Sequence, residues 1–133
     1  MGEFTEFEDL INNLGDAVVV CDAGGKITFW NGAAERMFGF TRAEALGSSL
    51  DIIIPDRIRK RHWDGFHKTM ETGHTKYGDD VLRVPAIGKG GKSLSIAFTV
   101  AIMYGHYGNV VAIASVMRDE TGRSGSSPAQ APS

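Results

Sequence analysis

The histidine at position 62 is the residue whose type and position most directly suggest chemistry. It lies in the stretch RHWDGFHKTM, residues 61–70, which has the periodicity of an amphipathic helix. At about 100° per residue, His62 falls on the same arc as Ile58, Phe66 and Met70, whereas most charged side chains point elsewhere. An imidazole on an apolar arc either binds a ligand in the interior or packs there with both nitrogens satisfied, because an unpaired buried nitrogen costs free energy.

The other three histidines are poorly placed to share a metal with His62. His67 follows it by five residues, which puts the two rings on different sides of a helix. His74 follows a glycine at an expected helix end, and His106 lies in an expected turn. The spacing predicts a solvated His67, a capping or exposed His74, and no zinc or iron site built from several histidines.

Patterns typical of enzymes are missing. The segment GKGGKS, residues 88–93, has alanine where a phosphate loop needs its first glycine, and it leads into a strand, so it predicts a hairpin turn. Asp79 and Asp80 would face opposite sides of a strand, which makes them a poor acid–base pair. Cys21 lies in a short apolar run and is expected to pack as a small hydrophobe. The protein is therefore not expected to be an enzyme.

Capping residues and periodicity predict the helices that must position His62. Thr41 and Glu44 have the spacing of a capping box, and Asn31 can cap the helix that follows it. Pro55 fits the start of the longest helix, which Gly73 ends. The predicted helical segments are 5–14, 32–38, 41–47 and 55–72, with 48–54 as a short irregular or helical link.

The remaining elements read as strands. Residues 93–103 alternate apolar and small or polar side chains, which predicts an antiparallel strand with one buried face. Residues 16–31 read as a hairpin, and Pro85 implies an edge position or a bulge for the strand 78–87. With a last strand at 110–119, the sequence predicts an α+β fold: one five-stranded antiparallel sheet with helices on one face. Five aromatic residues are expected to pack the core or a pocket wall: Trp30, Phe38, Phe40, Trp63 and Phe98.

Length and charge bound the function. The 133 residues suffice for one domain, and the net charge of −2 gives no electrostatic case for binding nucleic acid. No stretch has the length and apolarity of a membrane segment, and one cysteine cannot form an intrachain disulfide, which favours the cytoplasm. We expect an N-terminal cap helix over 1–15, one domain over 16–121 and a disordered tail over 122–133.

Four stretches, taken in order, make the sequence resemble a PAS domain. They are DAVVVCDAGGKITFWNGAAERMFGFTRAEALG, IIPDRIRKRHWDGFHKTMETG, GKGGKSLSIAFTVAI and RDET, and the resemblance spans about residues 5–123. It implies a PAS fold and a sensory, signal-transducing module. The pocket of such domains holds haem, flavin, another chromophore or a small metabolite, or stays empty.

The resemblance also implies a ligand for His62. Oxygen-sensing PAS kinases of nitrogen-fixing bacteria carry their haem-binding histidine on this helix, seven residues after a proline, as His62 follows Pro55. It therefore implies a b-type haem on His62 that reports a diatomic gas (O2, CO or NO). In those sensors an arginine of the next strand contacts the gas; Leu82 stands at its place here, and Arg83 is one residue off. The expected metal ligand is His62, and the expected cofactor-binding residues are His62, Ile58, Arg59, Phe66, Met70, Leu82, Arg83, Ile96, Phe98 and Met117.

Two other functions stay open. One is a protein-interaction module with an empty or small-metabolite pocket, in which His62 is structural. The other is a flavin photosensor, although the motif NCRFLQ of light-oxygen-voltage domains is absent. For any of the three, the resemblance implies a homodimer through the N-terminal helix and the sheet, and a downstream effector such as a histidine kinase, a cyclase or a transcription regulator.

Overall fold

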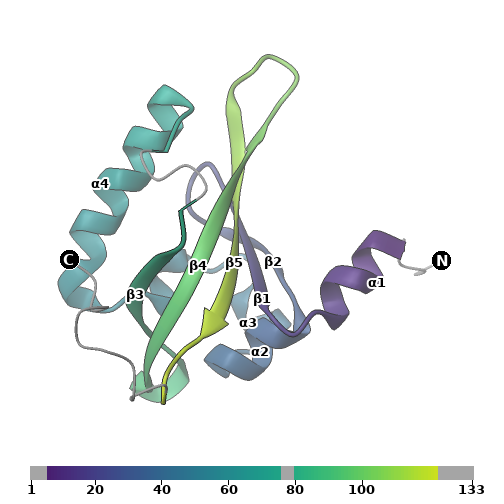
Figure 1. Ribbon diagram of the computed structural model, residues 1–133. Helices are drawn as coiled ribbons and strands as arrows, with labels where there is room; N and C mark the ends of the chain where they lie inside the picture. The colour runs from purple at the N-terminus through teal and green to yellow at the C-terminus, as the bar shows by residue number, and fades with distance from the viewer. Residues whose placement is uncertain (1–5, 76–79, 123–133) are drawn as a thin grey trace.

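A five-stranded antiparallel sheet with the strand order β2-β1-β5-β4-β3 forms the frame of the protein in the computed structural model (Figure 1). The structure describes residues 6–75 and 80–122. The strands are β1 (Ala17–Asp22), β2 (Ile27–Trp30), β3 (Leu82–Ile87), β4 (Ser93–Tyr104) and β5 (Val110–Asp119). The predicted fold class is confirmed.

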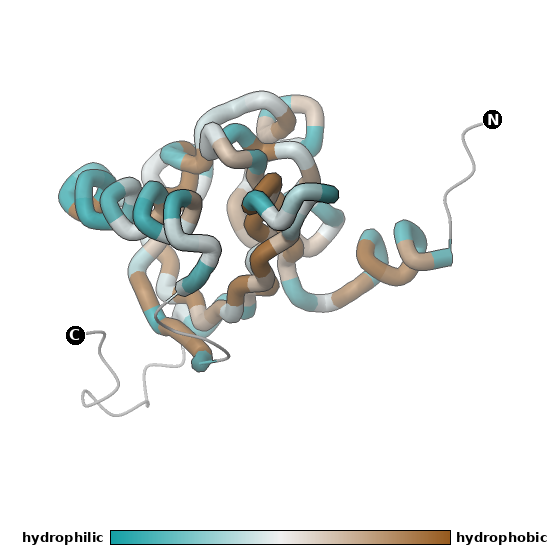
Figure 2. Tube along the Cα trace, turned by 90° about the horizontal axis from the view of Figure 1, so that it is seen from above, coloured by the Kyte–Doolittle hydropathy of each residue, from teal (hydrophilic) through white to brown (hydrophobic). Residues whose placement is uncertain are grey.

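The helices are α1 (Glu6–Asn13), α2 (Gly32–Phe38), α3 (Arg42–Ala45) and α4 (Asp56–Thr72), with a 3-10 turn η1 (Leu50–Ile53) before α4. Helices α2, α3 and α4 lie on one face of the sheet, which we call the inner face, whereas α1 has no buried residue and projects from the body of the domain (Figure 1). Seen from above, apolar segments follow the strands, whereas α4 on the left is mostly hydrophilic (Figure 2). Alternate strand residues and one side of α2 make the core, whose largest fully buried side chains are Trp30, Phe38, Ile27 and Val19.

The buried side chain of Asn31 joins three elements. Its Oδ1 accepts hydrogen bonds from the backbone N–H groups of Val18 in β1 (2.9 Å) and Ala34 in α2 (3.0 Å). Its Nδ2 donates to the carbonyls of Ile11 (2.8 Å) and Asp16 (3.1 Å). Asn31 therefore caps α2, as the sequence predicts, and also ties α1 and β1 to it.

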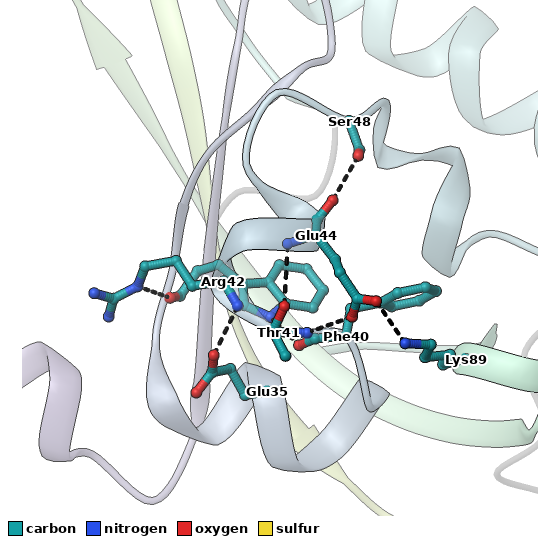
Figure 3. A network of polar contacts seen from close by, with 8 residues as sticks. Glu35, Phe40, Thr41, Arg42, Glu44, Ser48 and Lys89 are labelled. Carbon is teal, nitrogen blue, oxygen red and sulfur yellow. Dashed lines mark hydrogen bonds and ion pairs between the residues drawn. The ribbon is translucent and has the colours of Figure 1, made fainter.

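The capping box at the start of α3 also reaches the turn between β3 and β4. Thr41 and Glu44 exchange the two reciprocal hydrogen bonds of the motif, as predicted (Figure 3). The Glu44 carboxylate accepts a hydrogen bond from Lys89 Nζ at 2.5 Å, and that bond is the main reason why the pKa of Glu44 lies below its usual range. Arg42 extends the network by donating to the Trp30 carbonyl, so α3 is joined to β2.

The element boundaries differ from the predictions at several ends. Strand β3 begins at Leu82, whereas the strand was predicted from residue 78, and positions 78 and 79 lie outside the described residues. The predicted tail lies outside them too, apart from Gly122. Pro85 does sit in an edge strand, because β4 is the only strand that pairs with β3 in the described part of the sheet.

Replacing Asn31 with alanine is expected to lower the free energy of unfolding by about 2–4 kcal/mol, because two buried N–H donors lose their acceptor and α2 loses its cap. Urea unfolding followed by circular dichroism measures this loss. Asn13→Ala is the matched control: its exposed amide bonds only the Asp9 carbonyl within α1, so the loss should stay below about 0.5 kcal/mol. Equal losses in both variants would contradict the role of Asn31.

Candidate functional site

Helix α4 is attached to the rest of the domain mainly by side chains near its ends. Few of its Cα atoms approach those of other elements, and its course beside the sheet is visible in Figure 1. Near its start, Arg59 donates to the carbonyls of Ile54 (2.9 Å) and Asp51 (3.1 Å). At its end, the Tyr104 hydroxyl of β4 donates to the Gly73 carbonyl (2.7 Å). The middle of α4 is therefore positioned by these end contacts and by the side chains that point inward.

His62 lies in that middle part, and its ring is half-buried. The imidazole meets the indole of Trp63 edge-on, with 4.6 Å between ring centroids, and lies 6.1 Å from the Phe66 ring. Its Nδ1 is fully buried and has no hydrogen-bond partner, a condition that no other buried side-chain nitrogen or oxygen shares in residues 6–75 and 80–122. A buried polar atom without a partner is costly and calls for an explanation such as a ligand.

The surroundings of His62 favour its neutral form. Burial lowers the pKa of His62 below its ordinary value of 6.5, and the negative charge of Asp51 opposes part of this shift. A neutral imidazole has a free lone pair, which is the form that binds metals. The ring is therefore chemically suited to be a ligand at neutral pH.

The sheet places several of the predicted site residues in a row on its inner face. Leu82 pairs with Phe98, and Phe98 pairs with Met117, so these three side chains lie side by side across β3, β4 and β5. Met117 is buried, whereas Leu82 and Phe98 are only partly buried although they stand on the core side of the sheet. Ile96, two residues before Phe98, is buried on the same face. A partly accessible apolar surface thus lies on the inner face of the sheet.

On α4 the predicted side chains follow the expected arc. Phe66 is the only fully buried residue among the described residues of α4, while Ile58 and Met70 are partly buried. Arg59 is already engaged by the carbonyls named above and by an ion pair with Asp56 at 2.5 Å. Its guanidinium therefore holds the start of α4 in place.

Arg83 is on the opposite face of the sheet from Leu82. Its side chain is exposed and pairs with Glu120, with 3.3 Å between Nε and Oε1. This is the placement that alternation along a strand requires, because neighbouring residues point to opposite faces. Arg83 therefore does not line the inner face in this structure.

The other histidines and the cysteine show no sign of a metal site or of a reactive thiol in the described part of the chain. His67, His74 and His106 are exposed, and the part of the chain that the structure describes has no group of three or more His, Cys, Asp or Glu side chains that could hold a metal ion. Burial, with a contribution from Asp22, raises the pKa of the Cys21 thiol to about 11. The thiol is therefore protonated at neutral pH and a weak nucleophile. Asp79 lies outside the described residues.

Sequence reasoning missed the pairing of Trp63 with Asp51. The indole Nε1 donates to Asp51 Oδ1 at 2.7 Å, which links α4 to η1. The two residues are far apart in sequence and belong to different elements, so no linear pattern pairs them. An open hollow of about 530 Å³ is lined by Arg57, Ile58, Lys60, Arg61 and Asp64 of α4.

The family follows from a comparison with known families. The family model that describes the PAS fold matches residues 5–119. The chain belongs to the PAS family. A PAS domain is a sensory input module and has no catalytic role of its own.

Individual relatives agree with this assignment. The PAS domain is 36% identical over 58 residues to sensor protein FixL of Bradyrhizobium diazoefficiens, covering 44% of this chain and 12% of that protein. It is 30% identical over 70 residues to the oxygen sensor protein DosP of Escherichia coli, covering 53% of this chain and 9% of that protein. The chain thus spans about a tenth of the length of these relatives.

A solved structure supports the fold. The crystal structure of a PAS domain from Colwellia psychrerythraea superposes with a TM-score of 0.74 at 20% identity, covering 86% of this chain and 93% of that one. In the described part of this PAS domain, no helix has the length and apolarity needed to cross a membrane.

His62 is expected to make the stability of the PAS domain depend on pH. Its pKa is lowered in the folded state, so below about pH 6.5 the unfolded chain binds a proton that the folded domain does not, and the free energy of unfolding falls on acidification. The slope from this residue cannot exceed about 1.4 kcal/mol per pH unit. Urea unfolding at pH 7.5, 6.5 and 5.5 measures it, and His62→Leu should flatten the profile over this range.

His106→Gln is the matched control, because that side chain is exposed in the turn between β4 and β5 and should leave the profile as in the wild type. A His62→Leu variant that loses as much stability on acidification as the wild type would show that the dependence arises elsewhere.

Proposed function

We propose that this PAS domain binds a b-type haem through His62 and reports a diatomic gas. The observation that carries the proposal is the buried Nδ1 of His62, which has no partner in a ring whose neutral form is favoured. Coordination to a haem iron would satisfy one nitrogen of such an imidazole. Haem supplies the gas-binding iron, and the protein supplies the ligand and the apolar surroundings.

The side chains that we propose as the lining of the site are apolar and come from α4 and the inner face. They would contact the flat faces of the macrocycle and exclude water, which is what a mostly apolar cofactor needs. Arg59 is assigned to holding α4, and Arg83 is left out because it points away. The proposed lining is Ile58, Phe66, Met70, Leu82, Ile96, Phe98 and Met117.

The gas is supported by the relatives and by the family resemblance. DosP is named an oxygen sensor, and the resemblance points to oxygen-sensing kinases. By that resemblance, Leu82 would stand at the place of the arginine that contacts the gas in those kinases, and its side chain on the inner face is apolar. The proposal therefore covers O2, CO and NO as a class.

Titration of the purified full chain with hemin tests the proposal. We expect a Soret band that forms at a ratio of one hemin per chain and that is lost in His62→Ala, because the iron loses its axial nitrogen. His67→Ala, which removes an exposed histidine of the same helix, should keep the wild-type spectrum. Equal spectra for the two variants would contradict ligation by His62. Absence of a complex in the wild type would favour the interaction module, and a yellow, fluorescent protein would favour a flavin.

The proposal includes a homodimer through α1 and the outer face of the sheet. Phe7 and Leu10 of α1 are 77% and 58% exposed, and α1 projects from the body of the domain (Figure 1). The outer face of β1, β4 and β5 carries the charged Asp22 and Arg118, but Val20, Thr99, Ala101, Met103, Ala112, Ala114 and Val116 are uncharged, and Met103 and Val116 are 45% and 40% exposed. Exposed apolar surface of this kind is typical of protein contacts. A downstream effector such as a histidine kinase, and a cytoplasmic location, belong to the same proposal.

Sedimentation of the double variant Phe7→Lys/Leu10→Lys tests the dimer. Two charges on the apolar side of α1 should shift the wild-type dimer to a monomer, because buried lysines lose hydration without a partner. Glu6→Gln/Asp9→Asn, also in α1, raises the net charge by the same two units at exposed positions and serves as the control. A dimer that is retained by the first variant would place the interface elsewhere.

A further inference from the structure

We propose that Trp63, seated in a slot formed by Gly25 and Asp51, is the positioning residue of the ligand site. The slot sets the rotation of α4 about its axis. The rotation in turn determines where the His62 ring points and how tightly the domain binds haem. The inference about affinity rests on the proposed function, whereas the inference about the rotation of α4 does not.

Gly25 forms the floor of the slot. It lies in the turn between β1 and β2, is buried, and has a φ of +83°, a conformation that favours glycine. A methyl group at this position would lie 2.4 Å from the indole carbon Cη2 of Trp63. The backbone of the turn and the indole are thus in direct contact, which a side chain at position 25 would prevent.

Asp51 forms the polar end of the slot, and its own position is determined by η1. The Asp51 N–H donates to Ser49 Oγ (3.1 Å), and its carbonyl accepts from Ile54 N–H (3.1 Å). The Leu50 N–H donates to the Gly25 carbonyl (3.0 Å), so η1 and the β1–β2 turn are tied together. The carboxylate that receives the Trp63 N–H is therefore presented by a hydrogen-bonded support.

Trp63 lies directly beside His62. The two residues are neighbours on α4 and their rings are in contact, while the Trp63 and Phe66 rings meet edge-on with centroids 5.0 Å apart. Since α4 has few backbone contacts with the sheet, side chains that lock into other elements decide how the helix is rotated. If the indole left its slot, His62 and Phe66 would turn with the helix.

Three single variants of the full chain separate this role from ordinary stabilisation. Asp51→Ala removes the acceptor of the Trp63 N–H together with a 3.8 Å ion pair to Arg59, whereas Asp51→Asn keeps a side-chain oxygen at the same place and loses the charge and that ion pair. Asp56→Ala is the matched control, because it removes the ion pair with Arg59 and leaves the Trp63 contact untouched. The readouts are amide hydrogen exchange along α4 and β5, and the dissociation constant for hemin.

We expect Asp51→Ala to raise exchange in the middle of α4 by about three- to tenfold while β5 stays within twofold, because a hydrogen bond to a partly exposed charged acceptor is lost locally. The dissociation constant for hemin should rise by a similar factor. Asp51→Asn should restore both values to within about twofold of the wild type, and Asp56→Ala should match the wild type.

Two results would overturn the inference. One is exchange in α4 that is the same in Asp51→Ala and the wild type. The other is a rise of equal size in α4 and β5, which would make Asp51 a general contributor to stability. If the wild type fails to bind hemin, the proposed function fails, yet the exchange data still decide the role of the slot.

Discussion

The amide of Asn31 is the interaction on which the rest of the structure depends. Its oxygen and nitrogen are buried in a core of apolar side chains, where each unpaired polar atom would cost free energy, and they find backbone partners in α1, in the link that follows α1, in β1 and in α2. Because the partners belong to three elements, only one arrangement of these elements satisfies the amide. The two N-terminal helices and the central part of the sheet are therefore locked together as a unit.

Helix α4 is built differently. It is joined to this unit by side-chain hydrogen bonds of Arg59 and Trp63, by the Tyr104 hydroxyl and by inward rings, and it keeps a buried imidazole nitrogen without a partner. A protein that maximised stability would satisfy or remove that nitrogen. In the proposed function, a ligand that pairs with this atom would shift α4 between two packings against the sheet.

Several features of this arrangement could be predicted from the sequence. The capping residues Asn31, Thr41 and Glu44 mark their helices because the hydrogen bonds of a cap are local. The spacing of apolar residues along α4 predicts which side chains turn inward, because helical periodicity is also a local property. The structure accordingly places Phe66 and one nitrogen of His62 in the interior. Strand ends were predicted less well, since the start of β3 depends on where β4 runs alongside it.

The sequence by itself determined the order of the elements, the fold class and the side of each element that faces inward, because these follow from periodicity and from interactions between residues a few positions apart. Only the tertiary structure decided what those inward side chains meet. The row of Leu82, Phe98 and Met117 depends on strand register, and the contact of Trp63 with Asp51 depends on how α4 packs beside η1. Such contacts join residues distant in the chain, so their geometry exists only once the whole domain has folded.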